Sequence, residues 1–326
     1  MTAAALSGAA AGAARDAPSG PRADDLVLPF QIDAQGLRGR LVRLGGALDA
    51  ILTRHDYPAP VAQLLGEALV LAAALAATLK YDGVFTLQTK GDGPVAMMVA
   101  DVTTAGAMRG YAQVDRDKLA AALARPGPAI ADDPVPRLLG AGYLAFTVDQ
   151  GADTERYQGI VELTGATLSD CMHHYFRQSE QFQAAINLAV GQVDTPEGRQ
   201  WRGGAVMIQR LPDAQGADLD ENEEGWRNAM AMMASSTRRE LLDAALAPEA
   251  LLYRLFHESG VRVYRDKPVV DQCRCSRERV VGMLRGLPRD DLAELKVDGR
   301  FIVTCEFCNR QYPIGEAELS ASAAAS

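Results

Sequence analysis

Four of the five cysteines in this 326-residue chain lie close together near its C-terminus. They form two close pairs, Cys273-Arg274-Cys275 and Cys305-Glu306-Phe307-Cys308, with 29 residues between the pairs. Two such pairs deliver four sulfur ligands to one tetrahedral site, which is the geometry that zinc favours, and a closed site of this kind leaves no position for a substrate. The sequence therefore predicts one zinc ion per chain, bound by Cys273, Cys275, Cys305 and Cys308.

The metal is also expected to be a requirement for folding. The window from Cys273 to Cys308 spans only 36 residues, and domains below roughly 40 residues rarely fold on the burial of apolar surface alone. Zinc contributes on the order of 10 kcal/mol or more to the folding of such modules. A hairpin pattern at 297–303 delivers the second cysteine pair at a turn, as in other small zinc modules.

Two interpretations of this site remain open from the spacing. Most four-cysteine zinc sites are structural, and the spacing alone favours that role. Zinc also keeps sulfur in the thiolate form that oxidants attack, and the members of each pair are close enough in sequence to form a local disulfide. Oxidation would then remove the ligands, release the metal and unfold the module. A disulfide across one intervening residue is strained and readily reduced, so such a switch would be reversible.

Composition and charge exclude several classes of protein. Hydrophobic residues make up 48% and charged residues 23% of the chain, which is ordinary for a globular protein of about two domains. The net charge of -9 provides no field to attract nucleic acid or an anionic membrane. A secreted disulfide framework would spread its cysteines along the chain, so the clustered thiols indicate a reducing compartment.

The N-terminal sequence lacks the basic start and apolar core of a secretory signal. Residues 1–25 are rich in Ala and Gly and are expected to form a disordered tail. The longest apolar run, at 68–79, has 12 residues, whereas a membrane span needs about 20. We therefore expect a cytoplasmic protein with no membrane partner.

Hydrophobic periodicity and turn signals predict both strands and helices. Consecutive strands interrupted by separate helices indicate the α+β class rather than a regular βαβ alternation. A helix at about 61–80 is rich in Ala and Leu and apolar on nearly all sides, so we expect it at the centre of the fold. The other predicted helices cover 48–54, 117–124, a segment from Thr167 or Ser169 to about 181, 226–244 and 251–257. The predicted strands cover 26–32, 37–44, 84–90, 95–102, 108–114, 143–148, 157–163, 185–190 and 204–209.

Changes in composition divide the chain into domains. Residues 213–224 hold six acidic residues and no basic ones, which is typical of an exposed linker. The expected organisation is a disordered tail at 1–25, an α+β core at 26–212, a linker with helices at 213–260, a zinc-binding module at 261–315 and a tail at 316–326.

Many short motifs follow one another in a particular order between about residues 26 and 319. In the C-terminal part they are Leu255-Phe256-His257-Glu258, Cys273-Arg274-Cys275-Ser276-Arg277-Glu278-Arg279, Cys305-Glu306-Phe307-Cys308-Asn309 and Tyr312. In the N-terminal part they include 38–44, His55-Asp56-Tyr57-Pro58, Leu64-Leu65-Gly66-Glu67, Gly91-Asp92-Gly93-Pro94, Arg109-Gly110-Tyr111, 157–163, Tyr175-Phe176 with Ser179-Glu180-Gln181, and Gly203-Gly204 with Ile208-Gln209. In these motifs the chain resembles the HslO family of redox-regulated heat-shock holdases, also called 33 kDa chaperonins.

The resemblance implies a stress-activated, ATP-independent chaperone that is not an enzyme. In that family the reduced, zinc-bound form is inactive, and oxidants acting with heat or another unfolding stress convert the four cysteines into two disulfides. Carried onto this chain, the disulfides are Cys273–Cys275 and Cys305–Cys308. The metal then leaves, the module and the preceding linker unfold, and a surface for unfolded client proteins is exposed. The active form of the family is a homodimer.

Two other functions have weaker support. A zinc-ribbon nucleic-acid binder normally carries a basic surplus, but residues 271–313 hold eight Arg or Lys and seven Asp or Glu, and a zinc ion with four thiolates brings the sum to about -1. A thiol-disulfide oxidoreductase usually places one Cys-x-x-Cys at a helix N-terminus within a βαβ pattern. Here Cys305 follows strand-like residues, and two cysteine pairs are present.

The remaining candidate residues are interpreted as structural. Cys171 is expected to be a small buried apolar residue, because a dyad of Cys171 with His174 has no evident orienting partner. His55 is likewise expected to have a structural role. An apolar helix core is the favoured role, ahead of adaptable client contacts, for Met230, Met232 and Met233.

Overall fold

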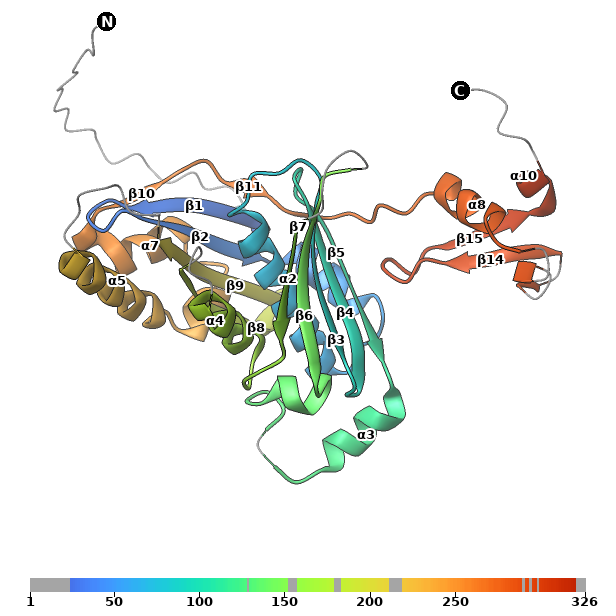
Figure 1. Ribbon diagram of the computed structural model, residues 1–326, viewed down its shortest axis with the longest axis horizontal. Coiled ribbons are helices and arrows are strands. Elements are labelled where there is room, and N and C mark those ends of the chain that lie inside the picture. Colours follow the sequence, from blue (N-terminus) through green and yellow to red (C-terminus); the bar gives the residue numbers. More distant parts are fainter. Residues whose placement is uncertain are drawn as a thin grey trace, which may run out of the picture.

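The computed structural model describes residues 24–127, 129–151, 157–178, 183–210, 219–288, 291–292, 295–297 and 299–320. Two large sheets with their helices form the core, and a small C-terminal module carries a three-stranded sheet of its own (Figure 1). Helix and strand each account for 36% of the chain, so the predicted α+β class is confirmed.

The first large sheet has the strand order β10-β1-β2-β9-β8, with β11 also paired to β1. Gly36 turns the chain between β1 and β2 with a φ of +61°, a conformation that favours glycine. The β8–β9 hairpin is longer than the strands predicted at 185–190 and 204–209, because polar residues near its tip pair in the ladder without an apolar signal. The strands are β1 (Leu26–Ile32), β2 (Leu37–Leu44), β8 (Ala184–Thr195), β9 (Gly198–Arg210), β10 (Val261–Val263) and β11 (Lys267–Pro268).

The second large sheet has the strand order β12-β5-β4-β3-β6-β7. Its described pairings are antiparallel except the one between β12 and β5, which is parallel. The predicted turn at 91–93 joins β3 to β4, and the carboxylate of Asp92 fixes it by accepting a hydrogen bond of 2.8 Å from the Ala141 N–H. The strands are β3 (Val84–Gly91), β4 (Val95–Thr103), β5 (Ala107–Val114), β6 (Gly142–Asp149), β7 (Tyr157–Glu162) and β12 (Val270–Asp271).

Helix α2 (Ala59–Ala76) is the centre of the fold, as predicted. Its buried side chains join residues of both large sheets and of α1 (Gly46–Thr53) in one apolar cluster. The helix is long and apolar enough to cross a membrane, but 78% of it is buried inside the protein, as a core helix requires.

The predicted disordered tail at 1–25 is wrong for its last two residues. The carboxylate of Asp25 accepts hydrogen bonds of 2.7 Å from the Gly45 N–H and 3.1 Å from the Ala47 N–H, at the start of α1. Acidic side chains are stabilised there by the free N–H groups of the first helical turn. Asp24 forms an ion pair with the buried Arg202. The rest of the predicted tail lies outside the described residues.

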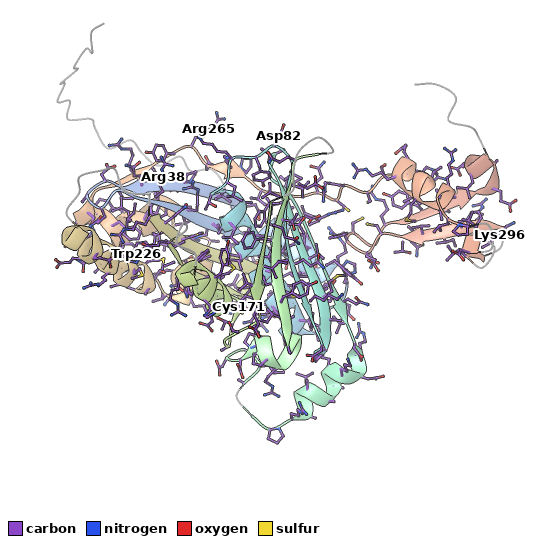
Figure 2. All side chains as sticks on the ribbon, in the orientation of Figure 1. Arg38, Asp82, Cys171, Trp226, Arg265 and Lys296 are labelled. Carbon is purple, nitrogen blue, oxygen red and sulfur yellow. The ribbon has the colours of Figure 1, made fainter. Side chains whose placement is uncertain are left out.

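Three linker helices cover the face of the first sheet that α2 does not occupy (Figure 1). Their apolar side chains and those of this face form the second apolar cluster. Figure 2 shows Trp226 on the first of them, and its indole packs against this second apolar cluster. The rings of Phe30 in β1 and Phe256 in the last linker helix stack with their centroids 5.7 Å apart. The helices are α5 (Leu219–Ala234), α6 (Arg238–Leu242) and α7 (Pro248–Phe256).

The prediction of one continuous helix at 226–244 is wrong. The hydroxyls of Ser235 and Ser236 donate hydrogen bonds to backbone carbonyls one turn earlier, and α5 ends there. Such side-chain bonds compete with the helical ladder. Thr237 then caps α6 in a reciprocal capping box with Glu240.

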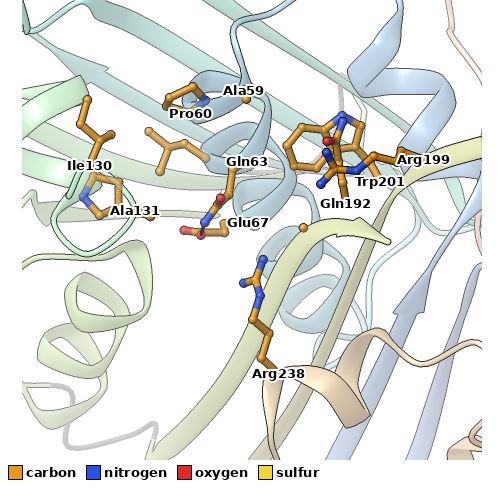
Figure 3. Close-up of a pocket in the computed structure, with 13 residues that line it drawn as sticks. Ala59, Pro60, Gln63, Glu67, Ile130, Ala131, Gln192, Arg199, Trp201 and Arg238 are labelled. Carbon is orange, nitrogen blue, oxygen red and sulfur yellow. Dashed lines mark hydrogen bonds between the residues drawn. The ribbon is translucent and has the colours of Figure 1, made fainter. Parts of the chain in front are cut away.

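A cavity of about 320 Å³ lies where α2, the β8–β9 hairpin and α6 meet (Figure 3). Glu67 of α2 and Arg238 of α6 both line it. The guanidinium of Arg238 donates a hydrogen bond of 2.5 Å to the carbonyl of Val190 at the edge of this cavity. The cavity therefore lies between the core and the linker.

Two further helices lie on the core, α3 (Arg116–Ala124) and α4 (Leu168–Gln178). The hydroxyl of Thr167 accepts a hydrogen bond of 3.1 Å from the Asp170 N–H, so Thr167 caps α4 as predicted. The expected end of this helix near 181 lies outside the described residues, as does the motif Ser179-Glu180-Gln181.

The C-terminal module has a small apolar core of its own. Its buried members are Val280, Leu284, Phe301, Tyr312 and Ile314. Residues 261–271, which precede these residues in the chain, pair with the core sheets through β10, β11 and β12. The predicted boundaries between the domains stay predictions. The elements of the module are α8 (Arg277–Arg285), β13 (Lys296–Val297), β14 (Arg300–Thr304), β15 (Gln311–Gly315) and α10 (Glu316–Ser320).

Candidate metal centre

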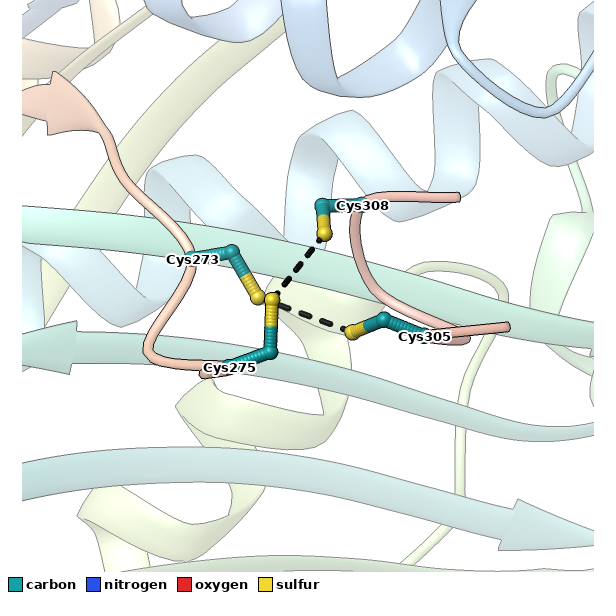
Figure 4. A group of neighbouring side chains, drawn as sticks. All are labelled: Cys273, Cys275, Cys305 and Cys308. Atoms are coloured by element: carbon teal, nitrogen blue, oxygen red, sulfur yellow. Dashed lines mark hydrogen bonds between the residues drawn. The ribbon is translucent and has the colours of Figure 1, made fainter. Parts of the chain in front are cut away.

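The structure brings the four clustered cysteines together. All four Sγ atoms lie within 4.8 Å of one another (Figure 4). The Sγ atoms of Cys273 and Cys305 are 3.7 Å apart, and those of Cys275 and Cys308 are 3.3 Å apart. Ligands at a metal–sulfur distance of about 2.3 Å in a tetrahedron lie roughly 3.8 Å from one another. The four sulfurs therefore fit a single metal ion.

Two short segments position these sulfurs. The first pair directly follows β12 and directly precedes α8, whose N-cap Ser276 accepts a hydrogen bond from the Arg279 N–H. The second pair lies in the turn between β14 and β15, which we call the cysteine turn (305–308). Cys305 closes this turn, because its N–H donates to the Arg310 carbonyl at 2.9 Å and its carbonyl accepts from the Asn309 N–H at 2.8 Å.

The four thiols differ in how readily they ionise. Burial raises the pKa of Cys308 to about 12 and also raises the pKa of Cys305. Burial opposes the ionisation of Cys275 too, but hydrogen bonds from Tyr312 and the neighbouring thiols lower its pKa to about 7. The Tyr312 hydroxyl donates to the Cys275 Sγ at 3.0 Å. All four cysteines are half-buried, so small oxidants have access to the cluster.

The fifth cysteine has the opposite environment. Cys171 in α4 is fully buried, far from the module (Figure 2), and its thiol donates to the Thr164 carbonyl at 3.1 Å. Burial raises the pKa of Cys171 to about 11. Its predicted role as a small buried residue is confirmed, and a thiol held in this protonated form is a poor nucleophile.

The sequence did not predict which residues of the core contact the cysteine turn. His55 lies beside this turn rather than in the interior, and its Nε2 is 3.3 Å from the Phe307 carbonyl oxygen. Arg109 places the carbon of its guanidinium 3.8 Å from the centroid of the Phe307 ring. The motifs that contain His55 and Arg109 were visible in the sequence, but no local pattern indicates that they meet the C-terminal motif.

A family model for the Hsp33 protein matches residues 25–315. The chain belongs to the Hsp33 family, whose members are redox-regulated chaperones. The 33 kDa chaperonin of Caulobacter vibrioides (strain NA1000 / CB15N) is 42% identical over 295 residues, which cover 89% of this chain and 95% of the relative. The 33 kDa chaperonin of Pseudomonas fluorescens (strain SBW25) is 36% identical over 298 residues, which cover 91% and 92% of the two chains. The predicted family is therefore confirmed.

The fold agrees with this Hsp33 assignment. The crystal structure of the 33 kDa chaperonin from Thermotoga maritima superposes with a TM-score of 0.74. It is 23% identical in sequence and covers 91% of this chain, which in turn covers 97% of that protein. Among the described residues of this Hsp33 chain, the four-cysteine cluster is suited to metal binding and redox chemistry.

The linker methionines of this Hsp33 chain divide between core and surface. Met233 is buried, Met230 is partly buried against the second apolar cluster, and Met232 is 48% exposed. The favoured helix-core role is therefore confirmed for Met233 and wrong for Met232, because Met232 points to solvent from α5.

Proposed function

We propose that the protein is an ATP-independent holdase that binds unfolding proteins and is activated when its cysteine cluster is oxidised. The four Sγ atoms within 4.8 Å of one another carry this proposal, because thiols so close together serve equally well as ligands of one metal and as partners in disulfides. Membership of the Hsp33 family supports the chaperone activity.

In the reduced form the proposed ligands are Cys273, Cys275, Cys305 and Cys308, and the proposed metal is zinc. Zinc prefers four sulfurs in a tetrahedron, and when bound it holds them as thiolates and links the two segments that carry them. The small apolar core of the module makes such a link important for its folding.

Oxidation forms the proposed disulfides Cys273–Cys275 and Cys305–Cys308. For each disulfide, two thiolates give two electrons to hydrogen peroxide, which takes up two protons from the solvent and becomes two water molecules. The cysteines then no longer serve as metal ligands. Because sulfur contacts of 3.7 and 3.3 Å also join the two segments, mass spectrometry of the oxidised protein is needed to distinguish these pairs from Cys273–Cys305 and Cys275–Cys308.

The surface for unfolded clients is proposed to lie under the linker. Apolar side chains of α6 and α7 cover the first sheet, with Leu241, Leu252 and Phe256 buried against residues such as Leu28 and Phe30. Loss of the folded module would free the linker, and its departure would expose this apolar face. We further propose that the oxidised form is a homodimer and that the protein acts in the cytoplasm, without enzymatic turnover, nucleic acid or a membrane as a partner.

The decisive experiment follows metal content and client aggregation together. Reduced protein is expected to hold about one zinc per chain and to suppress little aggregation of a heat-unfolded test protein. Peroxide with mild heat is expected to release the zinc and to start suppression without ATP. Equal suppression by both forms would remove the redox switch from the proposal.

A further inference from the structure

The cysteine turn is seated on the core by its aromatic residue. The ring of Phe307 lies under the guanidinium of Arg109 at 3.8 Å and beside the ring of Tyr111, whose centroid is 6.1 Å away. The His55 Nε2 approaches the Phe307 carbonyl oxygen at 3.3 Å. Phe307 is absent from the apolar cluster that forms the core of the module. Its described ring contacts are with Arg109 and Tyr111 of the core.

Arg109 also binds the buried carboxylate of Asp101, which an arginine from the first cysteine-bearing segment binds as well. Its guanidinium binds Asp101 of β4 at 2.7 and 2.8 Å, and Asp101 is 3% exposed. Arg274, which lies between the first two cysteines, binds the same carboxylate oxygen at 2.5 Å. Arg109 is 3.9 Å from the Cys273 Sγ as well. One core arginine thus touches both cysteine-bearing segments.

A second arginine flanks this contact. Arg54, just after α1, forms an ion pair with Asp271 of β12 and donates a hydrogen bond of 3.5 Å to the Phe307 carbonyl. The side-chain amide of Asn309 donates to the Arg54 carbonyl at 3.3 Å. The interface therefore consists of directional polar contacts around the ring of Phe307, and such contacts are lost when the turn changes shape.

We propose that Arg109 is the positioning residue that couples the cysteine cluster to the core. It retains Phe307 on β5 only while the four sulfurs keep the cysteine turn folded, so a change at the cluster releases the module from the sheet. This role rests on the proposed redox function, but the docking contact exists in the reduced protein and is measurable there. Coupling of this kind is reciprocal, so weakening the Arg109 contact must also make the cluster easier to open.

Two substitutions test the contact from its two sides. Arg109→Gln removes the charge above the ring, while Arg274 remains as a partner for Asp101. Phe307→Leu removes the aromatic face and leaves the arginine network intact. Arg199→Gln is the control, because Arg199 is exposed on the β8–β9 hairpin and its ion pair with Asp194 is long, at 3.7 Å.

Hydrogen exchange of the amides at 305–310 is measured in the reduced, zinc-loaded full-length protein. Either single substitution is expected to speed exchange on the order of tenfold, and the double variant is expected to add little, because both changes remove the same contact. The rate of zinc release under a fixed dose of peroxide is expected to rise in the same variants. The control is expected to behave as the wild type.

Unchanged exchange at 305–310 in Arg109→Gln would overturn the proposal, as would effects that multiply in the double variant. If Arg109→Gln fails to fold, Phe307→Leu decides alone: unchanged exchange in that variant overturns the proposal and faster exchange supports it. A wild-type protein that shows no oxidation-dependent suppression of aggregation would end the proposed function. The exchange result in the reduced protein would still decide the role of Arg109.

Discussion

The guanidinium of Arg43, buried within β2, donates a hydrogen bond of 3.0 Å to the main-chain carbonyl of Glu240 in α6. It also donates to the Asp243 carbonyl just after this helix. Carbonyls at the end of a helix have no partner within the helix. A charged side chain of the core sheet therefore fastens the short linker helix by its C-terminal end.

Arg43→Met is expected to loosen the linker while leaving the core folded. Each buried carbonyl left without a donor costs about 1–3 kcal/mol, and that cost disappears when α6 moves away from the sheet. Limited proteolysis of the reduced protein should therefore cut within 234–256 faster than in the wild type. Arg38→Met is the matched control, since Arg38 is exposed on the same strand. Equal cleavage of the Arg43 variant and the wild type would contradict the fastening role.

Glu67 is expected to make the protein less stable at alkaline pH. Burial raises its pKa to about 7, against smaller opposing effects of Gln63 and Arg238. This pKa lies above the unfolded value of 4.5, so the folded state favours the protonated carboxyl. The stability that the protonated carboxyl contributes is fully present below pH 4.5 and is lost as the pH rises through 7. Glu67→Gln should therefore stabilise the protein by up to about 3 kcal/mol at pH 8, with little effect below pH 4.5.

Urea unfolding of the wild type and the Glu67→Gln variant at both ends of this pH range measures the difference. Glu197→Gln serves as the control, because Glu197 is exposed at the tip of the β8–β9 hairpin. A difference between wild type and variant that is the same at acid and alkaline pH would mean that the cavity wall does not hold Glu67 in a protonated form.

Removal of the metal from the reduced protein is expected to unfold the C-terminal module while the core stays folded. Among the described residues, its apolar core has five buried members, too few to replace a contribution on the order of 10 kcal/mol from the metal. After chelation, amides of α8 and β14 should exchange at the rates of an unfolded chain, while those of α2 stay protected. Protection of α8 in the metal-free protein would show that the module folds without a metal.

Cys171→Ser is expected to leave the oxidation response unchanged. Burial raises the pKa of Cys171 to about 11, and the serine hydroxyl keeps a donor for the Thr164 carbonyl. The check is aggregation suppression after peroxide, with Cys275→Ser as the contrasting variant that should lose the switch. In the wild type, Cys171 should also resist alkylation while the protein is folded. A lost response in Cys171→Ser would place this residue within the switch.

The sequence predicts those features that depend on local pattern. The spacing of the cysteines predicts their meeting, because two short pairs on either side of a hairpin leave few other arrangements. Apolar content alone places α2 at the centre of the core. The break at Ser235–Thr237 was missed because the apolar stripe at 226–244 is interrupted along its length and does not mark one position, while the helix ends through hydroxyl groups that bond to the backbone.

Long-range contacts are the part that one sequence does not reveal. Nothing local indicates that β10, β11 and β12 join core sheets, because these strands have only two or three residues each. The contact of Arg109 with Phe307 joins positions far apart in the chain. In addition, a charged residue on a predicted strand is normally expected to be exposed. The partner of Arg109, Phe307, was visible only as one of the two residues between Cys305 and Cys308.

The three short strands β10, β11 and β12 also set an order of events. They lie in sequence between the linker helices and the first cysteine, and they attach the chain in turn to β1, again to β1 and then to β5 (Figure 1). Disruption that begins at the cysteines meets the two-residue β12 first, then the two-residue β11, and then β10 with α7 beside it. Under the proposed function, we therefore expect release to proceed strand by strand from the cysteines towards α7, with few hydrogen bonds to break at each step.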